Sequence, residues 1–332
     1  MKRFFSLLLG IASLVPVLPV SHAQTPASEG TQLLAPPYIR PETARLVAEG
    51  VWVIPDLRTR FVPNIGIVEG RNAILVVDVG MGPRNGQLLW EHARKVAGQR
   101  RIYFTSTHFH PEHNFGASAF EHATIILNRA QAEELKEKGE GYLKLFKGFG
   151  AVERKALEGT ILAKPGLTYS GSMHLDLGGR MVELREMPAH TRGDQMVIVE
   201  DSRVVFMGDL LENRFFPIMP DADAKGAQWI GVFDKVLALK PAIVVPGHGE
   251  VSDITLVQTV RSYLVDVQRE VNARAKRGMA QDAIIKELTP RLAALHPDWD
   301  EALWIPYQIA IFYSEATGKP VSLPDLTKDL QR

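Results

Sequence analysis

The chain has 332 residues, of which 45% are hydrophobic and 23% charged, and its 38 basic side chains balance its 38 acidic ones. This length and composition allow a large buried core, and the balanced charge gives no sign of a nucleic-acid partner or an anionic membrane surface. The chain has no cysteine, which excludes disulfides, cysteine nucleophiles and thiolate ligands. Any metal ion must therefore be held by nitrogen and oxygen atoms.

Residues 1–23 have the pattern of a cleaved signal peptide. Lys2 and Arg3 precede a mostly apolar run, and the segment ends in the small residues Ser21 and Ala23 around a histidine. This order of basic, apolar and small residues is what a signal peptidase reads. The alternative is a membrane anchor, for which the run is short and broken by prolines. We expect a periplasmic or secreted protein that has no membrane segment after cleavage.

The mature chain divides into three stretches. Residues 24–45 are rich in proline, serine and threonine, which predicts an exposed lead-in. Residues 46–254 alternate between apolar runs and amphipathic stretches and form the expected α/β domain. Residues 255–332 have helical periodicity and are expected to pack on the same domain.

Apolar runs between turn residues predict strands at 46–54, 64–68, 73–77, 101–106, 181–186, 196–199, 204–207 and 243–245. Helical periodicity predicts helices at 85–96, 128–147, 227–239, 255–277, 280–295 and 298–317. Pro290 and Pro306 are expected to break or kink the last two helices. The region 148–171 is less regular and is typical of a flap over a site.

The segment 107–113 (THFHPEH) places three imidazoles and a carboxylate within six residues. His108 and His110 alternate along an extended segment, so their rings point the same way. Further donors follow later strands: His190, Asp209 and His248. The carboxyl ends of strands are where sites gather in α/β sheets. Together with Glu112 and His113, these donors suit one or two divalent ions, zinc foremost, with iron or manganese as alternatives.

The remaining polar candidates have weaker signals. His92, His122, His174 and His296 lie in polar or helical surroundings and are expected to have no role in the site. Asp78 follows a buried strand, where it either caps the next helix or supports a ligand histidine. The loop 212–221, which carries Arg214 and Phe215, is expected to line a substrate pocket, with Arg214 facing a substrate carboxylate. Ordinary loop packing is the alternative. The aromatic residues near the C-terminus are expected to be helical core.

The motifs T-H-x-H-x-E-H, A-H-T-x-G-D, G-D and P-G-H-G, in this order, resemble the metallo-β-lactamase-fold hydrolases. The likeness is greatest to the glyoxalase-II-like branch and to exported quinoprotein-associated zinc metallohydrolases. It implies a four-layer αβ/βα sandwich with extra C-terminal helices.

The resemblance also implies roles for single residues. It assigns His108, His110 and His190 to a first metal and Glu112, His113 and His248 to a second. Asp209 would bridge both ions, and Asp78 and Thr107 would support the ligands from behind. Glu112 departs from the family, which usually has Asp there. The added methylene makes occupancy of the second site an open question.

The sequence therefore predicts an exported metal-dependent hydrolase. A metal-bound hydroxide would cleave a small ester, thioester, lactone or lactam, with Glu112 orienting the nucleophile or moving a proton. Two alternatives are a β-lactamase proper and a mononuclear iron oxidoreductase that resembles persulfide dioxygenases. A third is a metal-dependent binding protein without turnover. The sequence indicates a small-molecule partner and leaves the oligomeric state open.

Overall fold

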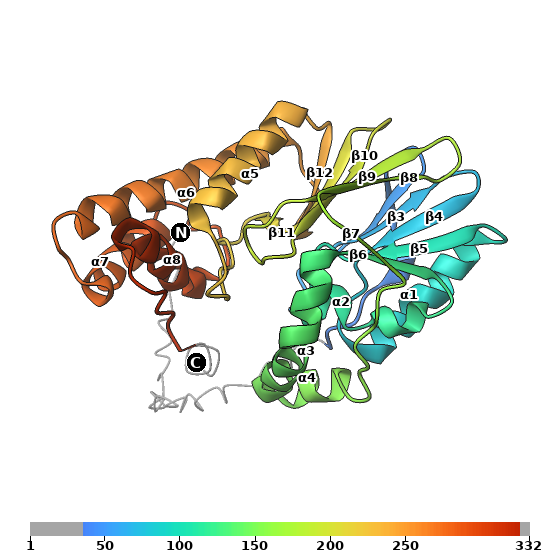
Figure 1. Cartoon of the computed structure of the whole chain (residues 1–332), viewed down its shortest axis with the longest axis horizontal. Coiled ribbons are helices and arrows are strands. Elements are labelled where there is room, and N and C mark those ends of the chain that lie inside the picture. Colours follow the sequence, from blue (N-terminus) through green and yellow to red (C-terminus); the bar gives the residue numbers. More distant parts are fainter. Residues whose placement is uncertain (1–35, 326–332) are drawn as a thin grey trace, which may run out of the picture. The chain divides into compact units, whose positions relative to one another are not determined.

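The computed structural model describes residues 36–325, which are built on two β-sheets (Figure 1). The first sheet runs in the order β1 (Arg45–Ala48), β2 (Val51–Ile54), β3 (Ile65–Glu69), β4 (Ala73–Val77), β5 (Arg101–Thr105), β6 (Thr124–Asn128), β7 (Leu167–Tyr169). The second runs in the order β12 (Ile243–His248), β11 (Val204–Glu212), β10 (Gln195–Val199), β9 (Met181–Glu186), β8 (Ser172–Asp176). Strands β4 to β7 are parallel, as are β11 and β12.

Alternating side chains explain why the two sheets face each other. In β4, Ala73, Leu75 and Val77 belong to the core between the sheets, whereas Ile74 and Val76 belong to a separate core on the outer face. Strand β10 repeats this pattern, with Val197 and Val199 on the inner side. Because successive residues of a strand point to opposite faces, an apolar run needs cover on both sides.

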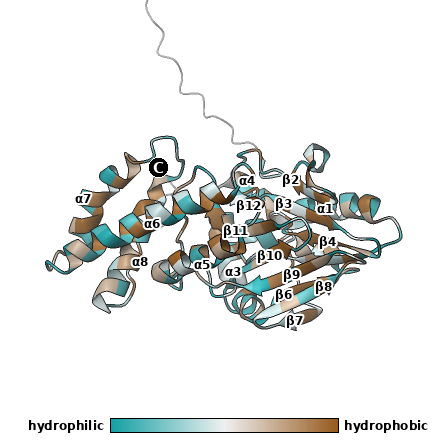
Figure 2. Ribbon diagram, turned by 90° about the horizontal axis from the view of Figure 1, so that it is seen from above, coloured by the Kyte–Doolittle hydropathy of each residue, from teal (hydrophilic) through white to brown (hydrophobic). Residues whose placement is uncertain are grey.

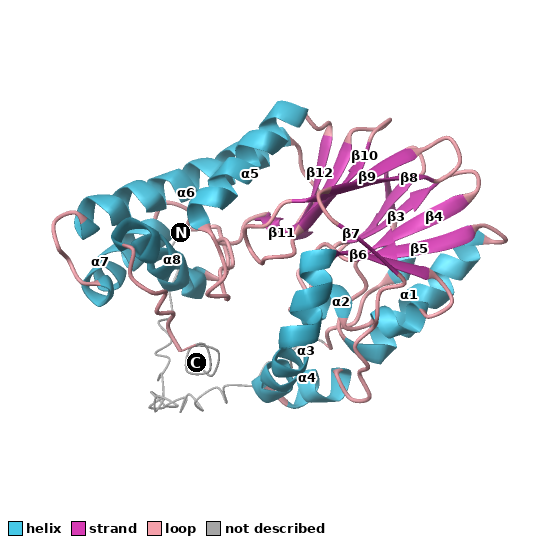
Figure 3. Ribbon diagram, viewed as in Figure 1, coloured by secondary structure: helices cyan, strands magenta, loops and turns pink. Residues whose placement is uncertain are grey.

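Helices supply that cover on both outer faces (Figure 3). The outer core of the first sheet includes residues of α1 (Gly82–Ala97), α3 (Arg129–Phe149), α4 (Ala151–Ala156) and η2 (Ala117–Phe120). The outer core of the second sheet includes residues of α5 (Gly226–Leu239), α6 (Ile254–Ala275), α7 (Gln281–Ala293), α8 (Ile305–Thr317) and η3 (Ala302–Trp304). The short elements η1 (Pro41–Thr43) and α2 (Pro111–Asn114) complete the set among the described residues. Three cores separate four layers, which is the predicted αβ/βα sandwich.

The hydropathy of the ribbon follows this arrangement (Figure 2). The strands carry mainly apolar residues, while α6 and α7 alternate between apolar and polar residues along their length. The aromatic residues Tyr263, Trp304 and Tyr307 are buried in the core shared by α5 to α8. Within residues 36–325, no helix combines the length and the apolar character needed to cross a bilayer.

Several elements differ from the sequence prediction. Strands β6 and β8 are additional, and the region 148–171 contains α4 and β7 rather than an irregular flap. Strand β11 continues to Glu212 because it pairs with β12 beyond an irregularity at Gly208. Pro290 lies inside α7 without ending it, and Pro306 lies in the first turn of α8, where its missing N–H needs no partner.

The expected signal peptide and most of the lead-in lie outside the described residues. The last part of the lead-in is not exposed as expected, since Ile39 is buried. Its backbone N–H donates to Asn85 of α1, whose amide in turn donates to the carbonyl of Pro37. Residues 37–39 are therefore part of the fold.

Candidate metal centre

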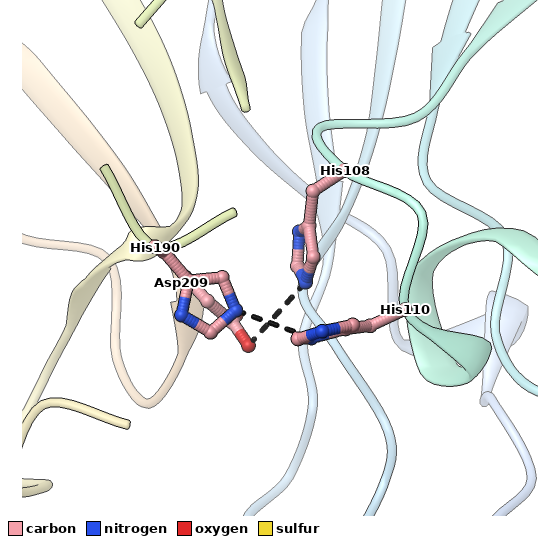
Figure 4. A group of neighbouring side chains, drawn as sticks. All are labelled: His108, His110, His190 and Asp209. Carbon is pink, nitrogen blue, oxygen red and sulfur yellow. Dashed lines mark hydrogen bonds and ion pairs between the residues drawn. The ribbon is translucent and has the colours of Figure 1, made fainter. Parts of the chain in front are cut away.

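Both halves of the sandwich deliver polar side chains to one place (Figure 4). His108 and His110 follow β5, and α2 then carries Glu112 and His113. The second sheet contributes the other three donors: His190 from the loop after β9, Asp209 from β11 and His248 from the end of β12. The structure thus brings together all seven residues that the sequence indicated as metal ligands.

The first group comprises His108, His110, His190 and Asp209, each of which offers a donor atom within 4.8 Å of the others. Nδ1 of His110 lies 3.1 Å from Nε2 of His190, and Nε2 of His108 lies 3.8 Å from Oδ2 of Asp209. In Figure 4 the three rings and the carboxylate point toward a common centre.

The second group shares Asp209 with the first and adds Glu112, His113 and His248 within the same limit. Oδ1 of Asp209 lies 3.1 Å from Nε2 of His113 and 3.6 Å from Nε2 of His248. Asp209 therefore presents one oxygen to each group. Asp209 could therefore contact an ion in each group.

The donor atoms fit divalent cations because several of them have no hydrogen bond within the protein. Five such buried atoms belong to the two groups within the described residues: Nε2 of His108, His110 and His113, Oε2 of Glu112 and Oδ1 of Asp209. Leaving such atoms unpaired in the interior costs about 1–3 kcal/mol each. A cation offsets that cost, and a nitrogen and oxygen set without sulfur is typical of zinc, iron or manganese.

The protonation states point in the same direction. Burial lowers the pKa of His108 well below its usual value and lowers that of His190 to about 3, so both rings are neutral donors. Burial also lowers the pKa of His113, but Asp209 and Asp78 outweigh it and raise this pKa well above its usual value. A proton on His113 thus takes the place of positive charge that a metal ion would supply.

Groups behind the donors hold the rings in orientation. The Asp78 carboxylate lies 3.0 Å from Nδ1 of His113 and accepts hydrogen bonds from the backbone N–H and the hydroxyl of Thr107. Oγ1 of Thr107 lies 3.2 Å from Nδ1 of His108. Nδ1 of His190 lies 2.8 Å from the carbonyl of Ile218. Such partners fix the tautomer and direct the opposite nitrogen to the metal.

Two glycines make room for Asp209. Gly208 has φ +53°, and a Cβ at this position would lie 2.4 Å from Oγ1 of Thr107. A Cβ on Gly247 would lie 2.0 Å from Oδ1 of Asp209. Any larger residue at these positions would displace a ligand or the hydroxyl that supports one.

A cavity of about 630 Å³ opens onto the centre, a volume in the range of small-molecule sites. His110, Glu112, Asp209 and His248 line one part of it. Phe215 lines it too, as expected. Arg214 is not among the lining residues, and its guanidinium lies 3.3 Å from Glu250 on the surface.

Other residues at the site were not among the predicted ligands. The Tyr142 ring stacks on His110 with centroids 4.9 Å apart, and its hydroxyl donates to Asp221 over 2.6 Å. Oδ2 of Asp221 lies 3.6 Å from Nε2 of His110. Oδ2 of Asp194 accepts the backbone N–H groups of residues 189, 190 and 191 and shapes the loop of His190. Of these residues only Asp194 lies in a motif that the sequence displays.

Comparison with known proteins identifies the family. Residues 58–248 match the family model of the metallo-beta-lactamase superfamily. The chain belongs to this superfamily. The metallo-beta-lactamase match ends at His248, so it covers every candidate ligand and stops before the C-terminal helices.

The relatives differ in activity. An acyl-coenzyme A thioesterase of Homo sapiens is 25% identical over 206 residues, which cover 56% of this chain and 72% of the thioesterase. A linear primary-alkylsulfatase of Pseudomonas sp. is 20% identical over 274 residues, which cover 70% of this chain and 51% of the sulfatase.

Solved structures show the fold. A metallo-beta-lactamase from Pontibacter korlensis aligns with a TM-score of 0.55 at 18% identity, covering 67% of this chain and 98% of that chain. The DIM-1 metallo-beta-lactamase aligns with the same score at 19% identity, covering 69% and 98%. Each alignment covers nearly the whole of the solved chain. The unmatched part of this chain is therefore additional to those two metallo-beta-lactamase structures.

Proposed function

We propose that this protein is an exported zinc-dependent hydrolase of a small ester, thioester or lactone. The observation that carries the proposal is the convergence of seven buried donors, several of them unpaired, beside a cavity large enough for a small molecule. The similarity to a thioesterase supports hydrolysis of a carbonyl substrate. Export rests on the pattern of residues 1–23.

His108, His110, His190 and Asp209 would hold one ion, and Glu112, His113, His248 and the second oxygen of Asp209 the other. When bound, such ions lower the pKa of a coordinated water to about 7 and polarise a substrate carbonyl.

The side chains themselves contribute orientation and proton transfer. Glu112 is 8% exposed, lines the cavity, and has an oxygen without a partner, so it is placed to accept a proton from the attacking water and pass it to the leaving group. Asp221 faces Nε2 of His110, opposite Nδ1, and Tyr142 stacks on the ring and donates to Asp221. This hydrolysis needs no protein nucleophile.

The alternatives have less support. A one-iron oxidoreductase would need only the first group, whereas the second group also has a complete set of buried donors. A β-lactamase proper usually needs a cation for the substrate carboxylate. The two arginines that line the cavity, Arg58 and Arg60, are each already paired with a carboxylate. The non-enzymatic reading is not favoured by any contact in the described residues.

Metal analysis combined with a substrate panel tests the proposal. The mature protein should contain up to two zinc ions per chain and should hydrolyse thioester or lactone reporters faster than a cephalosporin reporter. His174→Ala, which changes an exposed histidine outside the centre, serves as the control protein. One iron per chain with oxygen consumption would replace this proposal by the oxidoreductase, and intact metal without turnover would leave the binding protein.

A further inference from the structure

The wall of the cavity narrows the class of substrate, an inference that rests on the proposed hydrolase function. The wall begins on a candidate ligand, where Tyr142 stacks on His110 with an interplanar angle of 21°. From there Phe146 follows Tyr142, with ring centroids 6.2 Å apart. Phe61 and Phe149 extend the surface, their centroids lying 5.1 and 4.8 Å from that of Phe146. We call these four residues the aromatic wall.

The aromatic wall is part of a larger apolar surface. Leu145, Ile218, Pro220 and Trp304 also line the cavity. Because the wall starts at His110, a substrate whose carbonyl reaches the metal centre places the adjoining part of the molecule along these side chains. Apolar surface of this kind binds hydrocarbon and gains about 25 cal/mol for each Å² removed from water.

The positively charged side chains around the cavity are already paired with carboxylates. Arg58 lies 3.0 Å from Glu250 and 2.9 Å from Asp300, and it also donates to the carbonyl of Asn213. Arg60 lies 3.6 Å from Glu153. No lysine lines the cavity, and its only histidines are candidate ligands. The described part of the chain therefore offers the substrate no uncommitted cation there.

Negative charge, by contrast, is in excess. Besides the candidate ligands, four carboxylates line the cavity against two arginines: Asp56, Asp221, Asp300, which is the partner of Arg58, and Glu301. An anionic group on the substrate would meet repulsion in this lining.

We infer that the substrate is an ester or thioester of an apolar acyl group whose leaving group carries no net negative charge. The aromatic wall binds the acyl group, and the acidic lining excludes polyanionic leaving groups such as coenzyme A. On this point the protein differs from the acyl-coenzyme A thioesterase that it resembles.

Matched thioesters test the inference on the metal-loaded protein. We would measure kcat/KM for acetyl and octanoyl thioesters of N-acetylcysteamine, which is uncharged, and of coenzyme A. Each added methylene that is buried can raise kcat/KM by up to about fourfold, so octanoyl should exceed acetyl at least about tenfold. At low salt, kcat/KM for the octanoyl thioester of N-acetylcysteamine should exceed that for octanoyl-coenzyme A about tenfold. This difference should become smaller as salt screens the repulsion.

Variants separate the effect of the aromatic wall from the effect of the charged lining. Phe146→Ala should lower the octanoyl-to-acetyl ratio, whereas Leu135→Ala, which removes a buried side chain of α3 outside the cavity, should leave the ratio unchanged. Glu301→Gln should raise kcat/KM for the coenzyme A thioester relative to that for the N-acetylcysteamine thioester. Asp282→Asn, which changes an exposed carboxylate of α7, should leave this ratio unchanged.

The outcomes are distinguishable. If octanoyl-coenzyme A is the better substrate at low salt, or if chain length has no effect, the inference is overturned while the hydrolase function stands. If the metal-loaded protein hydrolyses none of the four thioesters, nor any ester or lactone reporter, the proposed function itself fails.

Discussion

Asp78 lies 3.0 Å from Nδ1 of His113, while Nε2 of the same ring lies 3.1 Å from Asp209. The imidazole is thus held between two carboxylates, one behind it and one at the candidate metal centre. Asp78 has φ +65° and also accepts two hydrogen bonds from Thr107, so its own position is fixed by the strand end. Of the two roles that the sequence left open for Asp78, this geometry matches support of a ligand.

Replacing Asp78 should therefore weaken metal binding without removing a ligand. We expect Asp78→Ala to lower zinc affinity about 10–100-fold, as loss of a supporting hydrogen bond to a ligand histidine usually does. A competition titration with a chromophoric chelator measures this, and Asp282→Ala is the matched surface control. Unchanged affinity would show that Asp78 serves only the turn.

His110→Ala removes a donor of the first group and should abolish most metal binding and activity. We expect a loss of kcat/KM of at least about a thousandfold, because the metal supplies several kcal/mol of transition-state stabilisation. Metal content by elemental analysis and turnover should fall together. His174→Ala should retain both, and activity of His110→Ala near that of the parent protein would refute the site assignment.

Glu112→Asp shortens the carboxylate to the residue usual in the family. Since Glu112 belongs to the second donor group, the variant should keep or raise occupancy of that group. Glu112→Gln should instead lower kcat about 10²–10⁴-fold if this carboxylate moves the proton. Metal stoichiometry and single-turnover rates distinguish the two effects. Complete loss of the second ion in Glu112→Asp would show that this pocket needs the longer side chain.

The raised pKa of His113 predicts that metal binding releases a proton. At neutral pH the metal-free ring is protonated, and a ligand must be neutral, so affinity should rise with pH up to the pKa of His113. Calorimetric titrations in buffers of different ionisation enthalpy measure the release. In the metal-free protein, charged His113 also stabilises the fold. This contribution is fully present below the pKa of the unfolded chain, about 6.5, and is lost as the pH rises through the pKa of His113 in the folded protein.

Gly247→Ala tests the close packing around Asp209. The added Cβ would lie 2.0 Å from Oδ1 of Asp209, so the carboxylate must move. Metal content should fall while the far-ultraviolet circular dichroism stays unchanged. Gly231→Ala, on α5 with open space around its Cβ, is the matched control. Full metal content in Gly247→Ala would mean that the bridging oxygen tolerates displacement.

Much of the fold could be predicted because its signals are local. The continuous apolar run of β4 indicated burial on both faces, and Ile74 and Leu75 indeed belong to different cores. Strand β8 was missed because most of its residues are exposed and few of them are apolar. Strand β6 was missed because it runs directly into α3, whose N-cap is the last residue of the strand, Asn128.

The donors could also be predicted, since histidine and aspartate at strand ends form motifs. The cavity could be predicted only in part, because most of its lining comes from distant segments without a motif. Tyr142 lies in the second half of a helix whose pattern shows only amphipathicity, whereas Asp221 ends the loop 212–221 that was expected to line the pocket. Arg214 was expected in the cavity from its place in that loop. Its guanidinium instead faces Glu250, while Arg58, from a segment without a predicted role, lines the cavity.

The division of donors between the two halves has a consequence for biogenesis. The first group is complete in sequence only at Asp209 and the second only at His248, and the two sheets must meet before either group converges. Metal uptake is therefore a late event that follows synthesis of most of the chain. If the chain crosses a membrane unfolded, as the proposed export implies, it acquires its ions on the far side. The metal supply of that compartment, rather than that of the cytoplasm, then determines which ion the protein carries.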